Sequence, residues 1–186
     1  GEDFRIVPFR GEYYRLAERR NGVVEHLIYP VPDPEMPFLG IHLTRMISGC
    51  VTVGPNAVLA LAREGYGWSD VSGSDLLDMA RFPGFWRLIT RYARPAATEL
   101  ANSLLQQRYL AECRKYCPDL SRDDLLPHPA GVRAQAVMAD GSLVHDFLIR
   151  RTRRTTHVCN APSPAATSAL PIGRYIVGEI ATSLAA

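Results

Sequence analysis

Hydrophobic positions divide the chain into a strand-like stretch, a helical stretch and a second strand-like stretch that ends in another helix. Short apolar runs broken by turn residues fill the first sixty residues and return after residue 129, as expected for strands. Between residues 70 and 118, apolar residues recur three and four positions apart, the period of helices packed on one face. The pattern favours an α+β fold, an antiparallel β-sheet with packed helices.

Turn residues place the strands expected in the first stretch. Gly11 interrupts the first apolar run, and Asn21-Gly22 is a strong hairpin signal. The prolines from Pro30 to Pro34 forbid a continuing strand, and a turn near Ser48-Gly49 joins the last pair. The expected strands cover residues 4–9, 13–18, 23–29, 38–46 and 50–54.

The helical stretch is delimited by a serine and three prolines. Ser74 is expected to cap a short helix, which Pro83-Gly84 interrupts. The longest helix follows Pro95 and ends before Pro118. Its apolar stripe, expected to pack against the sheet, comprises Leu100, Leu104, Leu105, Tyr109 and Cys113.

The last part of the chain is expected to return to a different domain. A hairpin is predicted around Asp140-Gly141, a strong turn dipeptide. The elements expected here are strands over residues 131–138, 143–149 and 157–159 and a helix from Pro164 to Ile180. A domain boundary is therefore expected near residue 126.

The composition is that of an ordinary globular protein, with 47% hydrophobic residues, 22% charged residues and a net charge of +2. This charge is too small to indicate a nucleic-acid surface, and no apolar run approaches the ~20 residues that span a bilayer. Cys113 and Cys117 share a helix face, but no second pair at metal-ligand spacing accompanies them. We expect no metal site and reduced thiols, as in the cytoplasm.

The segment from His157 to Thr167 carries the strongest chemical signal. It is expected to leave a strand, turn, and enter a helix capped by Ser163, with Pro164 at the first helical position. Free amides at the start of a helix attract an anion, or an electron-rich carbonyl such as that of a flavin. Taken alone, a generic helix cap explains Ser163 and Pro164 equally well.

Five motifs occur in order along the chain. They are Arg5-Ile6-Val7-Pro8-Phe9-Arg10-Gly11-Glu12-Tyr13-Tyr14, His42-Leu43-Thr44-Arg45, Val53-Gly54-Pro55-Asn56-Ala57, Pro129-Ala130-Gly131-Val132-Arg133-Ala134-Gln135 and the loop around Asn160. Together they resemble the C-terminal half of the L-2-hydroxyglutarate oxidase/dehydrogenase family, FAD-dependent members of the D-amino-acid-oxidase-like superfamily. The resemblance covers nearly the whole chain, but the family's Gly-x-Gly-x-x-Gly is absent near its start.

The resemblance implies a substrate-binding domain over residues 1–126 and a segment over 127–186 that completes a Rossmann-type FAD domain. The N-terminal half of the same polypeptide would be the missing partner, and FAD the cofactor of the complete enzyme. The fragment alone is expected to lack flavin and activity. The implied reaction oxidises a small dicarboxylate, L-2-hydroxyglutarate, to 2-oxoglutarate, in the cytoplasm or peripherally at the inner membrane.

Oxidation of a 2-hydroxy acid requires a cation for the carboxylate and an acceptor for the hydroxyl proton. Arg133 follows Gly131 in an apolar context and resembles the carboxylate clamp of related amino-acid oxidases; a structural salt bridge is the alternative. His42 is the candidate general base, or else a structural histidine. The further candidates for substrate binding are Tyr14, Thr44 and Arg45.

Other residues are assigned to the flavin or to solvent. The flavin-contacting residues implied by the resemblance are Gly131, Val132, Asn160, Ala161, Ser163, Pro164 and Ala165. The basic run from Arg150 to Arg154 lacks the interleaved aromatic residues of a nucleic-acid interface and is interpreted as a solvated strand end. Contact with a membrane or a quinone stays open. Two other functions also stay open: another amino-acid or 2-hydroxy-acid oxidase of the superfamily, and a non-catalytic carboxylate-binding module.

Overall fold

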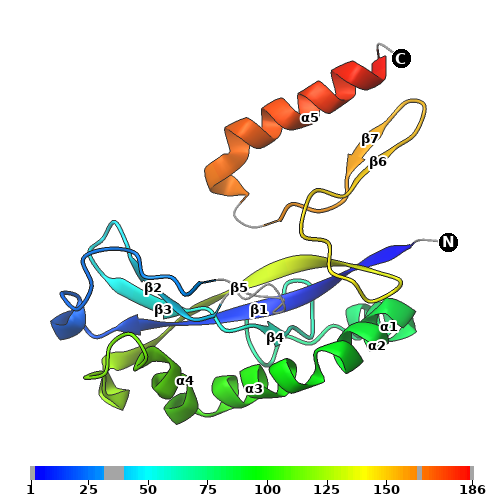
Figure 1. Ribbon diagram of the computed structural model, residues 1–186. Coiled ribbons are helices and arrows are strands. Elements are labelled where there is room, and N and C mark those ends of the chain that lie inside the picture. Colours follow the sequence, from blue (N-terminus) through cyan, green and yellow to red (C-terminus); the bar gives the residue numbers. More distant parts are fainter. Residues whose placement is uncertain (1–2, 32–39, 163–164, 185–186) are drawn as a thin grey trace.

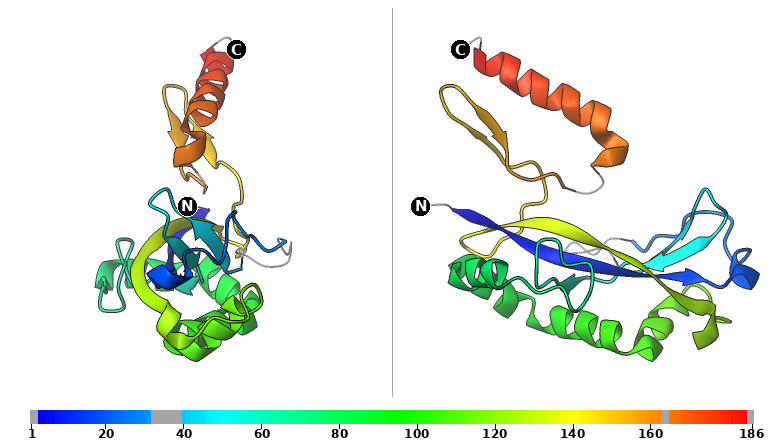
Figure 2. Two further views of the ribbon diagram at one scale, coloured as in Figure 1. Left: turned by 90° about the vertical axis from the view of Figure 1, so that its left-hand side faces the viewer. Right: turned by 180° about the vertical axis from the view of Figure 1, so that it is seen from behind.

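The computed structural model describes residues 3–31, 40–162 and 165–184. Within them, helices α1 to α4 cover one side of a five-stranded antiparallel sheet, while a β-hairpin and helix α5 stand on the other side (Figure 1). The end-on view in Figure 2 shows the same order of helices, sheet and C-terminal hairpin with α5. The predicted combination of an antiparallel sheet with packed helices is confirmed.

Two long strands form the centre of the sheet. β1 (Phe4–Leu16) and β5 (Leu125–Met138) pair from Phe4 opposite Met138 to Leu16 opposite Leu125. The other edge of β1 pairs with β3 (Val51–Gly54) and β4 (Val58–Leu59), and β3 pairs with β2 (His42–Arg45). The sheet therefore brings β2 and β5 to opposite sides of β1.

The break predicted at Gly11 is a register shift inside one strand. The pairing of β1 with β5 slips between Gly11 and Tyr13, but the strand continues to Leu16. A Cβ on residue 11 would lie 2.8 Å from the Cβ of Pro55. The glycine therefore permits a close approach of the β3–β4 connection rather than a turn.

The strand predicted over residues 23–29 does not form. Asn21-Gly22 belongs to a turn after the 3-10 helix Glu18–Arg20, and the side-chain oxygen of Asn21 accepts the amide of Val51 at 3.2 Å. Ile28 makes an isolated bridge to Leu43 through two hydrogen bonds of 3.0 Å. Because Asn21 is tied to β3, it does not form the tight turn that a hairpin would need.

The helical stretch divides into α1 (Gly73–Arg81), α2 (Pro83–Arg91), α3 (Ala93–Leu104) and α4 (Gln106–Cys113). Ser72 rather than Ser74 caps α1, since its hydroxyl accepts the amide of Asp75 at 3.3 Å. Leu105 has an extended backbone and splits the predicted long helix. No proline or glycine marks this break, so tertiary packing decides it.

Helices α1 to α4 bury two apolar clusters against the sheet. One cluster contains Val51, Val53, Leu43, Leu16 and, from α4, Tyr109, Leu110 and Cys113. The other contains Val7, Val137, Met79, Phe82, Phe85 and Leu88. Of the stripe predicted on the longest helix, Tyr109 and Cys113 are buried, whereas Leu100, Leu104 and Leu105 are exposed.

The C-terminal part departs further from the prediction. Residues 131–138 belong to β5, and Leu143 makes an isolated bridge to Val137 in place of a hairpin strand. β6 (Ile149–Arg151) pairs with β7 (Thr156–Val158), and α5 (Ala169–Leu184) follows a 3-10 turn. We call β6, β7 and α5 the C-terminal arm. The boundary expected at residue 126 falls inside β5, so the sheet unit continues to Met138.

Helix α5 begins five residues later than predicted, because of a proline. Pro171 lies in its first turn, where a missing N–H is tolerated. A helix starting at residue 164 would place Pro171 in its interior, where proline breaks the hydrogen-bond pattern. No helix among the described residues is long and apolar enough to cross a membrane.

A buried carboxylate ties the end of β1 to the start of β5. The side chain of Asp124 is fully buried and accepts the amide and hydroxyl of Ser121, both at 2.8 Å. Arg19 and Arg20 pair with it at 2.7 and 3.2 Å. Burial alone would raise the pKa of Asp124, but these hydrogen bonds and charges lower it to about 2.

We expect Asp124→Asn to lower the free energy of unfolding by about 2–3 kcal/mol at pH 7, because hydrogen bonds to a charged group are lost. The folded-state pKa lies below the ordinary value of 3.8. The contribution of the carboxylate is therefore present above pH ~4 and is lost as the pH falls towards 2. Melting temperatures of the complete protein and the variant should differ more at pH 7 than at pH 3; an equal difference at both would contradict this.

Candidate functional site

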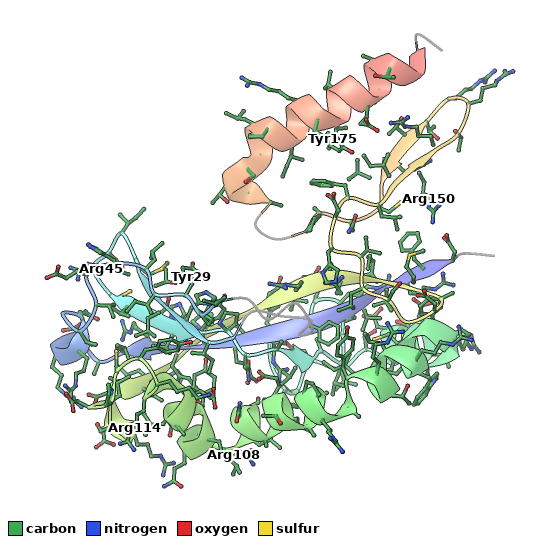
Figure 3. All side chains as sticks on the ribbon, viewed as in Figure 1. Tyr29, Arg45, Arg108, Arg114, Arg150 and Tyr175 are labelled. Atoms are coloured by element: carbon green, nitrogen blue, oxygen red, sulfur yellow. The ribbon has the colours of Figure 1, made fainter. Side chains whose placement is uncertain are left out.

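The two faces of the sheet have different neighbours. Tyr14, Leu43 and Val53 point toward the helices and pack with α4. Because side chains alternate along a strand, the opposite face, here called the open face, carries other residues. They are Tyr13 and Arg15 of β1 and His42 and Thr44 of β2. Figure 3 shows Tyr29 on the opposite side of the sheet from Arg108 and Arg114, which project from the helical layer.

Two of the predicted substrate-binding residues are engaged elsewhere. The ring of Tyr14 packs edge-on against Tyr109, with centroids 4.7 Å apart, on the helix-covered face. Arg45 shares the side of β2 that carries Leu43, and its guanidinium donates to the carbonyls of Asn21 and Val24, both at 3.2 Å. We therefore correct both assignments: alternation places Tyr13 and Thr44, not Tyr14 and Arg45, on the face of His42.

His42 is held by an aromatic stack and a backbone hydrogen bond. Its ring stacks on Tyr29, with centroids 4.3 Å apart and planes 19° from parallel. Its Nδ1 lies 3.3 Å from the carbonyl oxygen of Gly40, which can only accept. Nδ1 therefore carries the proton and Nε2 is the acceptor. Burial lowers the pKa of His42, with the Gly40 contact opposing it, so the imidazole is neutral at pH 7.

Arg133 and Tyr13 extend this group across β1. Arg133 lies on β5 opposite Phe9, and burial lowers the pKa of its guanidinium although much of the residue stays exposed. Burial raises the pKa of Tyr13, the charge of Arg133 lowers it and Tyr29 raises it. Tyr13 is thus within electrostatic range of both residues. Tyr29, in turn, stacks on His42.

A buried polar network explains two of the five motifs. Arg10 is 1% exposed, pairs with Glu12 at 2.9 Å and donates to the carbonyl of Gly67 at 2.9 Å. Its guanidinium also lies 4.2 Å from the ring centre of Trp68. Such a charge requires full pairing when buried. We infer that Arg10-Gly11-Glu12 is a structural element of β1.

The same network reaches the β3–β4 connection and α3. Asn56 accepts the amide of Glu12 at 2.9 Å and donates to its carboxylate at 2.9 Å. Ser103 of α3 donates to the same carboxylate. These contacts fix the backbone next to Tyr13. Sequence reasoning missed them, although two opposite charges two residues apart in an apolar strand were a usable signal.

A small polar cavity of about 110 Å³ separates β5 from the Asn160 loop. Its lining comprises Arg133, Ala134, Gln135, Ala136, Val144, His145, Asn160, Ala161 and Pro162. The side chain of Asn160 donates to the carbonyl of Asp146 at 2.9 Å and accepts the amide of Leu148 at 2.6 Å. The side-chain amide of Asn160 therefore holds the loop in place. A ligand in the cavity would contact the backbone of the loop.

The predicted flavin contacts fall into three groups. Gly131 and Val132 precede Arg133 on β5, and the space around Gly131 is open. Ala161 lines the polar cavity, while Ala165 precedes the 3-10 turn Ala166–Ser168 rather than a long helix. Ser163 and Pro164 lie outside the described residues. Cofactor pockets usually enclose about 300–1,000 Å³, so these residues fit one edge of a flavin and not the whole group.

A larger cavity of about 340 Å³ lies elsewhere. Leu88 of α2, Ala96 of α3 and Tyr92 between the two helices line part of it. Neither His42, Tyr13 nor Arg133 contributes to its lining. Since the candidate chemistry is absent from its walls, we do not assign the site there. Among the described residues, no group of three or more His, Cys, Asp or Glu side chains could hold a metal ion.

Sequence comparison identifies the class of protein. Residues 1–178 match the DAO family, described as FAD dependent oxidoreductase. The chain therefore belongs to this family of flavin-dependent oxidoreductases. Its helix-covered antiparallel sheet is consistent with a fragment of such a protein.

Individual relatives show which proteins of this family the chain resembles. The chain is 59% identical over 177 residues to L-2-hydroxyglutarate dehydrogenase of Salmonella houtenae, covering 95% of this chain and 42% of that protein. It is also 59% identical over 182 residues to the Escherichia coli K12 protein of the same name, covering 98% and 43%. The mitochondrial L-2-hydroxyglutarate dehydrogenase of Mus musculus is 41% identical, covering 95% and 39%. The chain thus spans about two fifths of the length of these curated relatives.

Proposed function

We propose that the complete protein oxidises L-2-hydroxyglutarate to 2-oxoglutarate with FAD as its cofactor. The observation that carries the proposal is the 59% identity, over 95% of this chain, to a protein named for that reaction. The polar group formed by His42, Tyr13 and Arg133 supports it chemically, because it combines a neutral base, a hydroxyl and a cation.

The residues of this chain have separate tasks in the proposed reaction. FAD, when bound, supplies the acceptor for the hydride that leaves carbon 2 of the substrate. Arg133 would hold the carboxylate attached to that carbon, since a guanidinium binds a carboxylate through two hydrogen bonds. Nε2 of His42 would accept the hydroxyl proton as the C–H bond breaks. The products are a 2-oxo acid, a protonated imidazole and the reduced cofactor.

The C-terminal arm is proposed to complete the flavin domain. An ion pair between Arg151 and Glu179 and the neighbouring rings of Phe147 and Tyr175, 6.0 Å apart, hold the arm together. Its helix α5 exposes Leu170, Tyr175 and Val177. Apolar side chains exposed on one element favour association with another part of the protein. We propose the N-terminal half of the same polypeptide as that part, so the substrate-binding unit extends to Met138 and the arm belongs to the flavin domain.

The proposal is tested with the complete reading frame, purified and mixed anaerobically with L-2-hydroxyglutarate while flavin absorbance is followed. We expect rapid bleaching in the wild type and bleaching slowed about 10²–10⁴-fold in His42→Gln, the range that general-base catalysis contributes. A flavin that is properly bound but does not bleach would refute the substrate. A complete protein that binds no flavin would support the carboxylate-binding module instead.

A further inference from the structure

The proposed substrate has a second carboxylate, and the open face offers a cation for it. We propose that Arg15 and Thr44 bind the distal carboxylate and so select a five-carbon dicarboxylate. The inference deepens the proposed function and rests on it. Arg45, the arginine expected for such a role, is engaged with the carbonyls of Asn21 and Val24.

Strand register places Arg15 and Thr44 in one row across the sheet. Arg15 of β1 pairs with Thr52 of β3, and Thr52 pairs with Thr44 of β2. Paired residues on neighbouring antiparallel strands project to the same face. The hydroxyl of Thr52 donates to the Thr44 carbonyl at 3.4 Å, and its side chain is buried between the two. Arg15 and Thr44 therefore stand on either side of Thr52.

Burial fixes which face this row occupies. Tyr14 packs against the helix-side cluster and Leu16 is buried within it. Arg15 lies between them in sequence and is exposed, so it points to the open face. The buried Leu43 gives the same result for Thr44 on β2. A guanidinium and a hydroxyl thus share the face that carries His42.

The proposed base lies in the adjacent row. His42 pairs with Gly54, two residues along β3 from Thr52, a spacing of about 7 Å. Tyr13 is likewise two residues from Arg15 along β1. A Cβ built on residue 54 would lie 3.0 Å from the Tyr13 ring and 2.7 Å from both the Tyr109 hydroxyl and the Glu12 carbonyl, so glycine is needed for the strands to approach here. The row of Tyr13 and His42 therefore lies directly beside the row of Arg15 and Thr44.

Arg133 lies on the other side of that row. It pairs with Phe9, four residues from Tyr13 along β1 in the direction away from Arg15. Phe9 packs against the helix-side cluster, whereas the register shift after Gly11 leaves Tyr13 on the open face. The charge of Arg133 lowers the pKa of Tyr13, so the two groups lie within electrostatic range of each other. The order along the sheet is Arg133, then Tyr13 with His42, then Arg15. A molecule with a carboxylate at each end and its reacting hydroxyl near one of them matches this order.

The experiment compares two substrates in the complete, flavin-loaded protein. L-2-Hydroxyglutarate has both carboxylates, whereas L-2-hydroxybutyrate has only the one next to the reacting carbon. In Arg15→Met we expect kcat/KM for the dicarboxylate to fall about 30- to 100-fold, mainly through KM, since one member of a charge pair is removed. The value for L-2-hydroxybutyrate should change less than threefold. Arg15→Lys should keep part of the preference, because it keeps the charge.

Arg45→Met is the matched control: it removes the same charge from β2, two strands away from β1 in the sheet. The ratio of the two kcat/KM values should stay within threefold of wild type. Arg15→Met with a wild-type ratio would overturn the inference. Calorimetric binding of glutarate to the oxidised protein gives a readout without turnover, and the Arg15→Met protein should bind it at least tenfold more weakly. If the wild-type protein fails to oxidise L-2-hydroxyglutarate, the proposed function is refuted. Glutarate binding that is weakened by Arg15→Met would still support a carboxylate site at Arg15. Glutarate binding that is unchanged by Arg15→Met would refute that site.

Discussion

Arg133→Met in the complete protein should lower kcat/KM for L-2-hydroxyglutarate by about 10²–10³-fold. Truncating one partner of a partly buried charge pair typically costs about 2–5 kcal/mol, and each 1.4 kcal/mol corresponds to a factor of ten. Burial lowers the pKa of Arg133, so its surroundings already exclude part of the water. In Arg133→Met, the substrate carboxylate would therefore lose its charged partner in surroundings that hold less water to replace it.

The Arg133 measurement needs steady-state rates with both L-2-hydroxyglutarate and L-2-hydroxybutyrate, because the proximal carboxylate is common to the two. Both rates should fall together, unlike the selective loss expected for Arg15→Met. Arg153→Met is a suitable control: it removes an arginine from the exposed tip between β6 and β7 and should leave both rates within twofold. If Arg133→Met had only a small effect on the rates with both substrates, Arg133 would have a structural role and would not bind the substrate carboxylate.

Glu12→Ala should be the most destabilising single substitution considered for the sheet. Its carboxylate pairs with the buried Arg10 and accepts hydrogen bonds from Asn56 and Ser103. Removing one partner of a buried ion pair costs about 3–5 kcal/mol, since the other charge is left uncompensated. We expect the melting temperature of the complete protein to fall by several degrees.

Two further variants separate the network from general effects on β1. Glu18→Ala removes an exposed carboxylate from the 3-10 helix that follows β1 and should be nearly neutral. In a double-mutant cycle, adding Arg10→Met to Glu12→Ala should cost much less than Arg10→Met alone, because the unpaired charge disappears. Equal melting temperatures for the Glu12→Ala and Glu18→Ala proteins would show that the network contributes little.

Local patterns in the sequence predicted the type of each region, but long-range contacts set the boundaries. The alternation around Val51 and Val53 and the helical period before Cys113 reflect burial on one face, which local sequence records. Leu105, by contrast, breaks a helix without a breaker residue. The helix that follows is tied to the sheet by a residue distant in sequence from its partners, since Tyr109 donates to the carbonyls of Val53 and Glu12. The late start of α5 follows from Pro171, a signal that the sequence contains.

The site was predictable in part for the same reason. His42, Thr44 and Arg133 were predicted from residue type and motif, and the structure brings His42 and Thr44 to one face. The choice between Tyr13 and Tyr14 could not be made from alternation alone, since the pairing of β1 shifts between Gly11 and Tyr13. The role proposed for Arg15 has no local signal in the sequence, because its neighbours on the sheet come from β2 and β3, about thirty residues later.

The pairing of β1 with β5 also sets the order of events during synthesis. Phe4 and Met138 are partners, so one edge of β1 stays at least partly unpaired until residue 138 has left the ribosome. An unpaired strand edge is a template for aggregation, and contacts this distant in sequence form slowly. Nascent chains arrested before β5 is complete should therefore associate with chaperones, whereas release after Met138 should allow the sheet to close.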